Sequence, residues 1–215
     1  MRAGAHLAIS VAFFLLGVPL FGQAEWRAAS EDVEEDRWSF EFATMGYVVP
    51  HERSYASPTF SADWQHLHTE ARYNYENQET GSLWVGYNFS TGQDVALQLT
   101  PMLGGVFGKA TGIAPGFRFS VTYKKFELSS EGEYVFDTGN RSSNFFYSWN
   151  ELTYSPADWF HTGLVSQRTR AYQTELDVQR GVSVGFSHNN VDFTTYVFNA
   201  GWTDPTFVLS LRFTF

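Results

Sequence analysis

The last nine residues of the chain alternate strictly between apolar and mostly polar side chains. Successive side chains of a β-strand point to opposite faces, so a period of two places every second residue on one face. The segment therefore predicts a strand with one fully apolar face and one mostly polar face. The apolar face carries Phe207, Leu209, Leu211, Phe213 and Phe215, and the other carries Val208, Ser210, Arg212 and Thr214.

This terminal segment, with its alternation and its final aromatic residue, resembles the closing strand of bacterial outer-membrane β-barrels. The resemblance implies that the barrel-assembly machinery recognises Phe215 and the alternating apolar residues before it, so that deleting Phe215 impairs assembly. It also implies a location in the outer membrane of a Gram-negative-type bacterium, in contact with outer-membrane lipid. What it implies is an architecture rather than an activity.

The N-terminus predicts a signal peptide. Arg2 supplies a positive start, an apolar run follows over residues 7–21, and small residues end the segment by position 24. A membrane-spanning helix needs about 20 apolar residues, and Gly17 and Pro19 interrupt this run. We therefore expect residues 1–24 to be removed and the rest of the chain to be exported.

The composition limits the class of exported protein. The chain has no cysteine, which excludes a small disulfide-stapled domain. Aromatic residues make up 18% of the chain although the mean hydropathy is −0.25, a combination that a barrel accommodates by placing aromatics toward lipid and polar residues inside. The net charge of −9 argues against nucleic acid as a partner. Part of that charge lies in residues 25–37, which we interpret as an acidic, disordered tail.

Residues 38–215 alternate in segments of about ten residues separated by turns, the pattern of transmembrane barrels. We expect an all-β fold, a transmembrane antiparallel β-barrel. Eleven segments can be recognised, whereas barrels of this class have an even number of strands. Twelve strands follow if residues 50–60 contain an irregular strand, and ten follow if residues 38–48 lie outside the wall. Twelve is the preferred interpretation, and the glycine-rich residues 104–108 are expected to be a flexible connection or strand end.

Two hairpins can be registered from the sequence. A two-residue turn at Lys124-Lys125 aligns the apolar residues of both strands and then sets an arginine opposite a glutamate on the polar face, a favourable cross-strand pair. A turn at Asn189-Asn190 aligns a second pair of apolar faces and sets a phenylalanine across a glycine. The pairs expected are Val121 with Leu128, Arg118 with Glu131, Phe186 with Phe193, and Gly181 with Phe198.

Two polar rows are predicted to line the lumen. The first runs along one face of the segment from Trp64 to Tyr75, opposite Leu67, Ala71, Tyr73 and Tyr75, and consists of His66, His68, Glu70, Arg72 and Asn74. The second faces Arg118 and consists of Glu127, Glu131 and Glu133. A His-x-His pair with Glu70 has the spacing of a metal site, but an ordinary polar row is the preferred interpretation. No metal or cofactor is expected.

Three functions remain open at this stage. The first is a narrow pore or passive channel for small solutes or ions, in which the glutamate row would favour cations. The second is a non-conducting structural or surface-interaction barrel. The third is a lipid-modifying enzyme, because twelve-stranded outer-membrane phospholipases are of similar size. Those enzymes carry His and Ser two residues apart on a lipid-facing strand, and no histidine of this chain has such a serine. We therefore expect no catalytic residues and no enzymatic activity.

Overall fold

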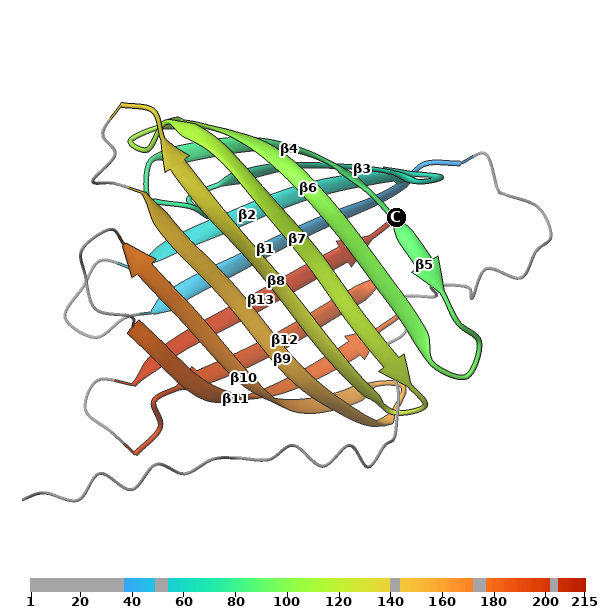
Figure 1. The fold of residues 1–215 in the computed structure, drawn as a ribbon. Coiled ribbons are helices and arrows are strands. Elements are labelled where there is room, and N and C mark those ends of the chain that lie inside the picture. The colour runs from blue at the N-terminus through green and yellow to red at the C-terminus, as the bar shows by residue number, and fades with distance from the viewer. Residues whose placement is uncertain (1–36, 49–53, 140–143, 172–176, 202–204) are drawn as a thin grey trace, which may run out of the picture.

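The strands of this computed structural model form a single antiparallel β-sheet that closes on itself (Figure 1). The structure describes residues 37–48, 54–139, 144–171, 177–201 and 205–215, so the predicted signal peptide and residues 25–36 of the acidic tail lie outside the described residues. No helix in the described part is long and apolar enough to cross a membrane. The strands are β1 (Ser39–Val48), β2 (Tyr55–Trp64), β3 (Leu67–Tyr73), β4 (Thr80–Tyr87), β5 (Phe89–Thr91), β6 (Ala96–Gly108), β7 (Gly112–Tyr123), β8 (Phe126–Asp137), β9 (Phe145–Ala157), β10 (Phe160–Ala171), β11 (Asp177–His188), β12 (Val191–Phe198) and β13 (Thr206–Thr214).

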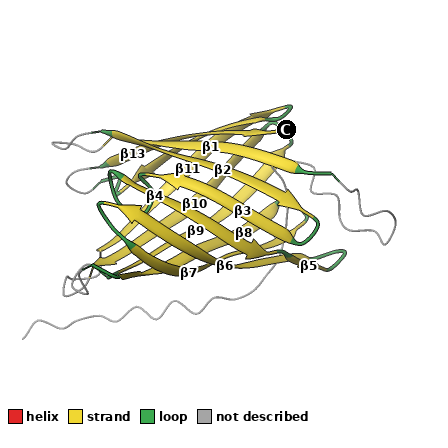
Figure 2. Cartoon of the chain, turned by 90° about the horizontal axis from the view of Figure 1, so that it is seen from above, coloured by secondary structure: helices red, strands yellow, loops and turns green. Residues whose placement is uncertain are grey.

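Consecutive strands pair with each other, except β4 and β5, and two further pairings close the barrel. β1 pairs with β13, and β4 pairs with β6. β4 and β5 are separated by Asn88 and both pair with β6, so they act as two parts of one strand. The wall of the described barrel therefore has twelve strands, and Figure 2 shows it from above. The predicted twelve-stranded antiparallel barrel is confirmed, and the ten-stranded alternative is wrong.

The strand that the sequence hid is β2, which lies over residues 55–64 rather than 50–60. Its inward residues Ser57, Thr59 and Ser61 are small and polar, and Ala56 and Pro58 weaken the outward apolar pattern. Both hairpin registers are confirmed: Val121 pairs with Leu128, Arg118 with Glu131, Phe186 with Phe193, and Gly181 with Phe198.

The first residue of each of these two turns has a positive φ. Asn189 (φ 51°) is a residue type that tolerates this conformation, whereas Lys124 (φ 51°) is not. The Lys124-Lys125 hairpin therefore owes its register to the pairing of its strands rather than to favourable turn chemistry.

The outer surface of the barrel is apolar. On β13 the exposed apolar residues belong to the alternating set predicted from the sequence: Phe207, Leu209 and Phe213. Aromatic rings gather at one end of the barrel, where Phe215 stacks on Phe40 and Phe40 stacks on Phe60. Most hairpin turns at that end are two residues long, and connections at the other end are mostly longer, which identifies the short-turn end as periplasmic.

Introducing a charge on the lipid face will destabilise the barrel according to its depth. Leu211 lies near the middle of the outward face of β13, and Phe207 lies near its extracellular end. We expect Leu211→Arg to lower the free energy of unfolding by about 2–4 kcal/mol and Phe207→Arg by about 1 kcal/mol or less. Urea unfolding in lipid vesicles measures both. Equal losses at the two positions would contradict the depth assignment.

Candidate functional site: a charged constriction in the barrel lumen

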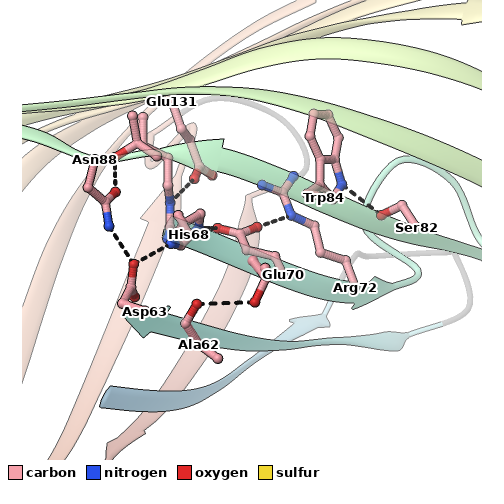
Figure 3. Close-up of polar contacts among 12 residues, drawn as sticks. Ala62, Asp63, His68, Glu70, Arg72, Ser82, Trp84, Asn88 and Glu131 are labelled. Atoms are coloured by element: carbon pink, nitrogen blue, oxygen red, sulfur yellow. Dashed lines mark hydrogen bonds and ion pairs between the residues drawn. The ribbon is translucent and has the colours of Figure 1, made fainter. Parts of the chain in front are cut away.

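A chain of charged side chains begins on β3 inside the barrel (Figure 3). His68 lies between two carboxylates, with Nδ1 2.7 Å from Asp63 Oδ1 and Nε2 2.7 Å from Glu70 Oε1. The second oxygen of Glu70 accepts a hydrogen bond from Arg72 Nε at 2.5 Å. Alternation along β3 places His68, Glu70 and Arg72 on the same inward face, where all three are almost fully buried.

The chain of charges continues across the lumen to the opposite wall. Arg72 Nη1 donates to Glu133 Oε2 on β8 at 2.9 Å. Arg118 on β7 reaches Glu70 Oε1 at 2.8 Å, and its Nε lies 3.7 Å from Glu131 Oε2. These contacts join strands that are not neighbours in the sheet, so the network braces the barrel from inside.

The guanidinium group of Arg72 lies between two aromatic rings. Its central carbon is 4.4 Å from the centroid of Tyr75 and 4.6 Å from that of Trp84. Trp84 Nε1 donates a hydrogen bond to Glu76 Oε1 at 3.1 Å, and the Tyr75 hydroxyl donates one to Glu131. A cation enclosed by π faces and carboxylates in a desolvated site is strongly held, so Arg72 is a fixed element of the lumen.

Glycine residues in the wall make room for Trp84. A Cβ at Gly104 would lie 2.5 Å from the Trp84 ring. Residues 104–108 form the end of strand β6, so the strand-end alternative of the expectation holds and the flexible connection is wrong. The glycines serve packing: the indole ring lies across the strand where a side chain would otherwise stand.

The side chains around Arg72 are tightly packed, and we call this level of the lumen the constriction. The space lined by Arg72, Tyr75, Glu131 and Tyr147 leaves no room for a water molecule. The extracellular half of the interior contains a cluster of buried apolar and aromatic side chains from five strands, which we call the lumen plug. Its members are Tyr47, Tyr147, Trp149, Val165, Tyr196, Phe198 and Val208.

The periplasmic half of the interior is polar and open to water. The side chains of Arg118 and Arg212 are 36% and 47% exposed, although both face inward. Arg212 Nε lies 3.5 Å from Glu41 Oε2. A second polar group lies close by on β10 and β12, where His161 Nε2 is 2.9 Å from Thr194 Oγ1. The constriction thus separates a charged periplasmic vestibule from the lumen plug.

The structure places the predicted lumen row in three different environments. His68, Glu70 and Arg72 point inward, as described above. His66 lies in the β2–β3 turn and stacks on Tyr87 with ring centroids 5.0 Å apart. Asn74 lies just beyond β3 with a φ of 56°, and its side chain bonds Ala56 O and Glu79 N.

This conformation at Asn74 ends the alternation of β3. Tyr75, which the alternation assigned to the outward apolar face, is therefore inside the barrel and bonded to Glu131. The two histidines lie apart, His66 in the turn and His68 inside, so they do not face one vacant position. Among the described residues, no three His, Cys, Asp or Glu side chains are grouped as metal ligands.

The second predicted row lies on the inward face of β8. Glu131 and Glu133 belong to the constriction, and Glu127 lies nearer the periplasmic end, where Thr122 donates to it at 3.4 Å. Arg118 lies opposite Glu131 in register, but its shorter contact is to Glu70. Sequence reasoning missed other inward carboxylates that lie outside its two rows: Glu41, Asp63, Glu76, Glu151 and Asp192.

Solved structures of porins share this fold. Two structures of the KdgM porin, one of them in complex with disordered oligogalacturonate, match with TM-scores of 0.59 and 0.58 at 10% and 9% identity. The matches cover 81% and 82% of this chain and 99% of each of those chains. A chain from a structure on the in-meso crystallization of membrane proteins matches with a TM-score of 0.53 at 12% identity, covering 82% of this chain and 83% of that chain. No protein-family model and no curated protein matches the sequence.

The fold is therefore that of an outer-membrane β-barrel, as the terminal strand predicted. The closed twelve-stranded wall and its apolar outer surface agree with this fold. They correspond to a location in the outer membrane of a Gram-negative-type bacterium.

Glu70 is the carboxylate on which the charged network depends. Glu70→Gln removes the carboxylate that Arg72 and Arg118 share. Arg118 is then left with Glu131 at 3.7 Å, while Arg72 keeps Glu133 at 2.9 Å. We expect the free energy of unfolding to fall by about 3–5 kcal/mol, since breaking a buried charge pair leaves uncompensated charge. Urea unfolding in vesicles measures it. The matched control is Glu131→Gln, whose side chain is 22% exposed, and it should cost less. An equal loss in both variants would contradict the central role of Glu70.

Gly104 and its neighbour Gly105 offer a matched pair of substitutions. Gly104→Ala forces a methyl group into the Trp84 ring and should cost about 1–3 kcal/mol. Gly105→Ala adds the same methyl group on the outward face, where nothing lies within 4 Å, and should leave stability unchanged. Thermal unfolding of both variants, followed by the change in gel mobility of the folded barrel, measures the difference. Equal melting temperatures would refute the assigned packing of Trp84.

Proposed function

We propose that this barrel is a narrow outer-membrane channel for small cations, closed at Arg72 in the conformation described. The observation that carries the proposal is the excess of carboxyl groups over basic groups in the interior. Three arginines face inward in the described barrel: Arg72, Arg118 and Arg212. The carboxyl groups there are Glu41, Asp63, Glu70, Glu76, Glu127, Glu131, Glu133, Glu151 and Asp192.

This charge excess favours cations over anions. Charged side chains that line a narrow lumen set the sign of the ions that enter, and carboxylates favour cations. One structural neighbour, the KdgM porin, was solved with oligogalacturonate, a chain of acidic sugars. The carboxyl groups of this lumen would repel such a polyanion, so we propose a small cation rather than an acidic oligosaccharide as the solute.

The constriction can open without disruption of the wall. Arg72 is held by carboxylates on two strands, but Tyr75 lies in the connection after β3, outside the hydrogen-bonded ladder. Tyr147 comes from β9 and meets Tyr75 with ring centroids 5.6 Å apart. Rotation of these two side chains would widen the passage beside Arg72. We propose that Tyr75 and Tyr147 form the movable side of the constriction and Arg72 the fixed side.

A non-conducting structural barrel is the second candidate, and the lumen plug favours it. Seven buried side chains pack together in the extracellular half of the interior, including Phe198 and Val208, which are fully buried. Packing of this kind stabilises a barrel whether or not solutes pass. The named solved structures that share the fold are porins, which supports transport over both this role and an enzymatic one.

Planar-bilayer recording tests the channel. We expect the wild-type protein to give small conductance steps whose reversal potential in a KCl gradient indicates cation preference. Tyr147→Ala should raise the conductance, because it removes a side chain that lines the constriction. Glu131→Gln should move the reversal potential toward that of a non-selective pore, because it removes a carboxylate at the same level.

The matched control is Glu79→Gln, which removes a carboxylate that is 70% exposed at the extracellular rim and pairs with Lys109. Its selectivity should match that of the wild type. Absence of conductance in both the wild type and Tyr147→Ala would refute the channel and leave the structural barrel. An anion preference would refute the proposed solute.

A further inference from the structure

The lipid-facing surface of the barrel is interrupted by one polar band. Two rows of outward residues cross strands β8 to β11, each residue opposite the next in register. The first row is Ser130, Asn150, Ser166 and Arg180, and the second is Gly132, Ser148, Arg168 and Val178. Elsewhere in the described wall the outward residues at this level are mostly apolar, as on β6 and β7.

The two arginines of this band carry unbalanced charge. Ser130 donates to Asn150 Oδ1 at 2.8 Å, so part of the band is satisfied internally. Arg168 and Arg180 are both exposed, and within the described residues neither forms an ion pair. Arg180 is opposite Ser166, the residue two before Arg168, so the arginines form a diagonal pair about 7–8 Å apart on β10 and β11.

Their height in the membrane matches the headgroups of the outer leaflet. Each arginine lies three residues from the extracellular end of its strand. Phe160, at the periplasmic end of β10, packs in a ring cluster with Trp159 and Phe186. From Phe160 to Arg168 the strand rises about 19 Å along the barrel axis, against an apolar band of about 25 Å. An arginine side chain extended toward the rim therefore ends at the membrane surface.

The surface below the arginines is apolar. Leu164 is 62% exposed, and Val182 and Phe186 are 47% and 50% exposed on the same outward face. Cations at headgroup height above an acyl-compatible surface match an amphiphile that has phosphate at its head. Arginine suits phosphate because its planar fork donates two parallel hydrogen bonds. A second copy of the chain fits less well, because a symmetric pairing through this band would bring arginine against arginine.

We infer that Arg168 and Arg180 bind a phosphate group of a lipid A-type glycolipid in the outer leaflet, with an acyl chain along Leu164 and Val182. The band is a lipid-binding surface outside the barrel and does not depend on conduction through the lumen. Ser166 is opposite Arg180 in register and two residues before Arg168, and it adds a hydroxyl donor within the same band.

Binding of purified lipid A to the folded, delipidated barrel tests the inference. The readout is native mass spectrometry, with dephosphorylated lipid A and phosphatidylglycerol as comparison probes. The double variant Arg168→Gln/Arg180→Gln should bind lipid A roughly 10- to 30-fold more weakly than the wild type. The double variant Arg168→Lys/Arg180→Lys should retain most of the affinity. The matched control Lys109→Gln, which removes another exposed cation at the extracellular end, should bind as the wild type does.

Several results would overturn the inference. Unchanged lipid A affinity in the glutamine double variant would show that the arginines do not hold the lipid. Equal binding of dephosphorylated lipid A would show that the phosphate is not what the arginines recognise. Equal binding of phosphatidylglycerol would show that the site does not prefer the glycolipid. Loss of lipid A affinity in Lys109→Gln would show that the lipid is attracted by the positive charge of the whole extracellular rim rather than held by the two arginines. The gel mobility of each variant before and after heating shows whether it has folded.

Discussion

The backbone hydrogen bonds that close the sheet are the constraint on which the rest of this structure depends. No water is present in the hydrocarbon of a membrane to satisfy an open strand edge, so the first and last strands must pair. That joint includes the final residue: Phe40 and Phe215 exchange both backbone hydrogen bonds at 2.9 Å, and their rings stack. Phe215 is therefore part of the closure as well as of the aromatic rings that gather at this end of the barrel.

Closure at twelve strands fixes how the interior must be filled. Half of the side chains of each strand point into a narrow lumen, where charges without partners are costly. Two kinds of packing in the interior avoid this cost. On the extracellular side the chain packs aromatic rings together, as where Trp149 meets Tyr196 and Phe198 edge-on. Around Arg72 it satisfies buried charges by contacts that cross the lumen. The constriction lies around Arg72 because charged partners and aromatic rings meet there.

Alternation predicted the strands other than β2, both hairpin registers and the inward position of Arg118 and Glu131, because each depends on a period of two within a local stretch of sequence. The partners across the lumen could not be predicted in this way. Arg72 and Glu133 are 61 residues apart, and their contact follows from barrel closure. The change of face at Tyr75 depends on one positive φ at Asn74, a local backbone choice that periodicity does not contain. The packing role of Gly104 was not predicted, because the space that it leaves for the Trp84 ring depends on the neighbouring strand.

The arginines of this barrel show how the same side chain takes different partners on the two faces of one wall. Every inward arginine of the described barrel has a carboxylate within 4 Å, supplied by the chain itself. Arg168 and Arg180 occupy outward positions, where alternation gives them only apolar and small polar neighbours. Among the described outward residues of this wall there is no carboxylate, and the proposed counter-charge at those positions is that of the membrane. The outer leaflet supplies it as phosphate, at the height where these two strands end.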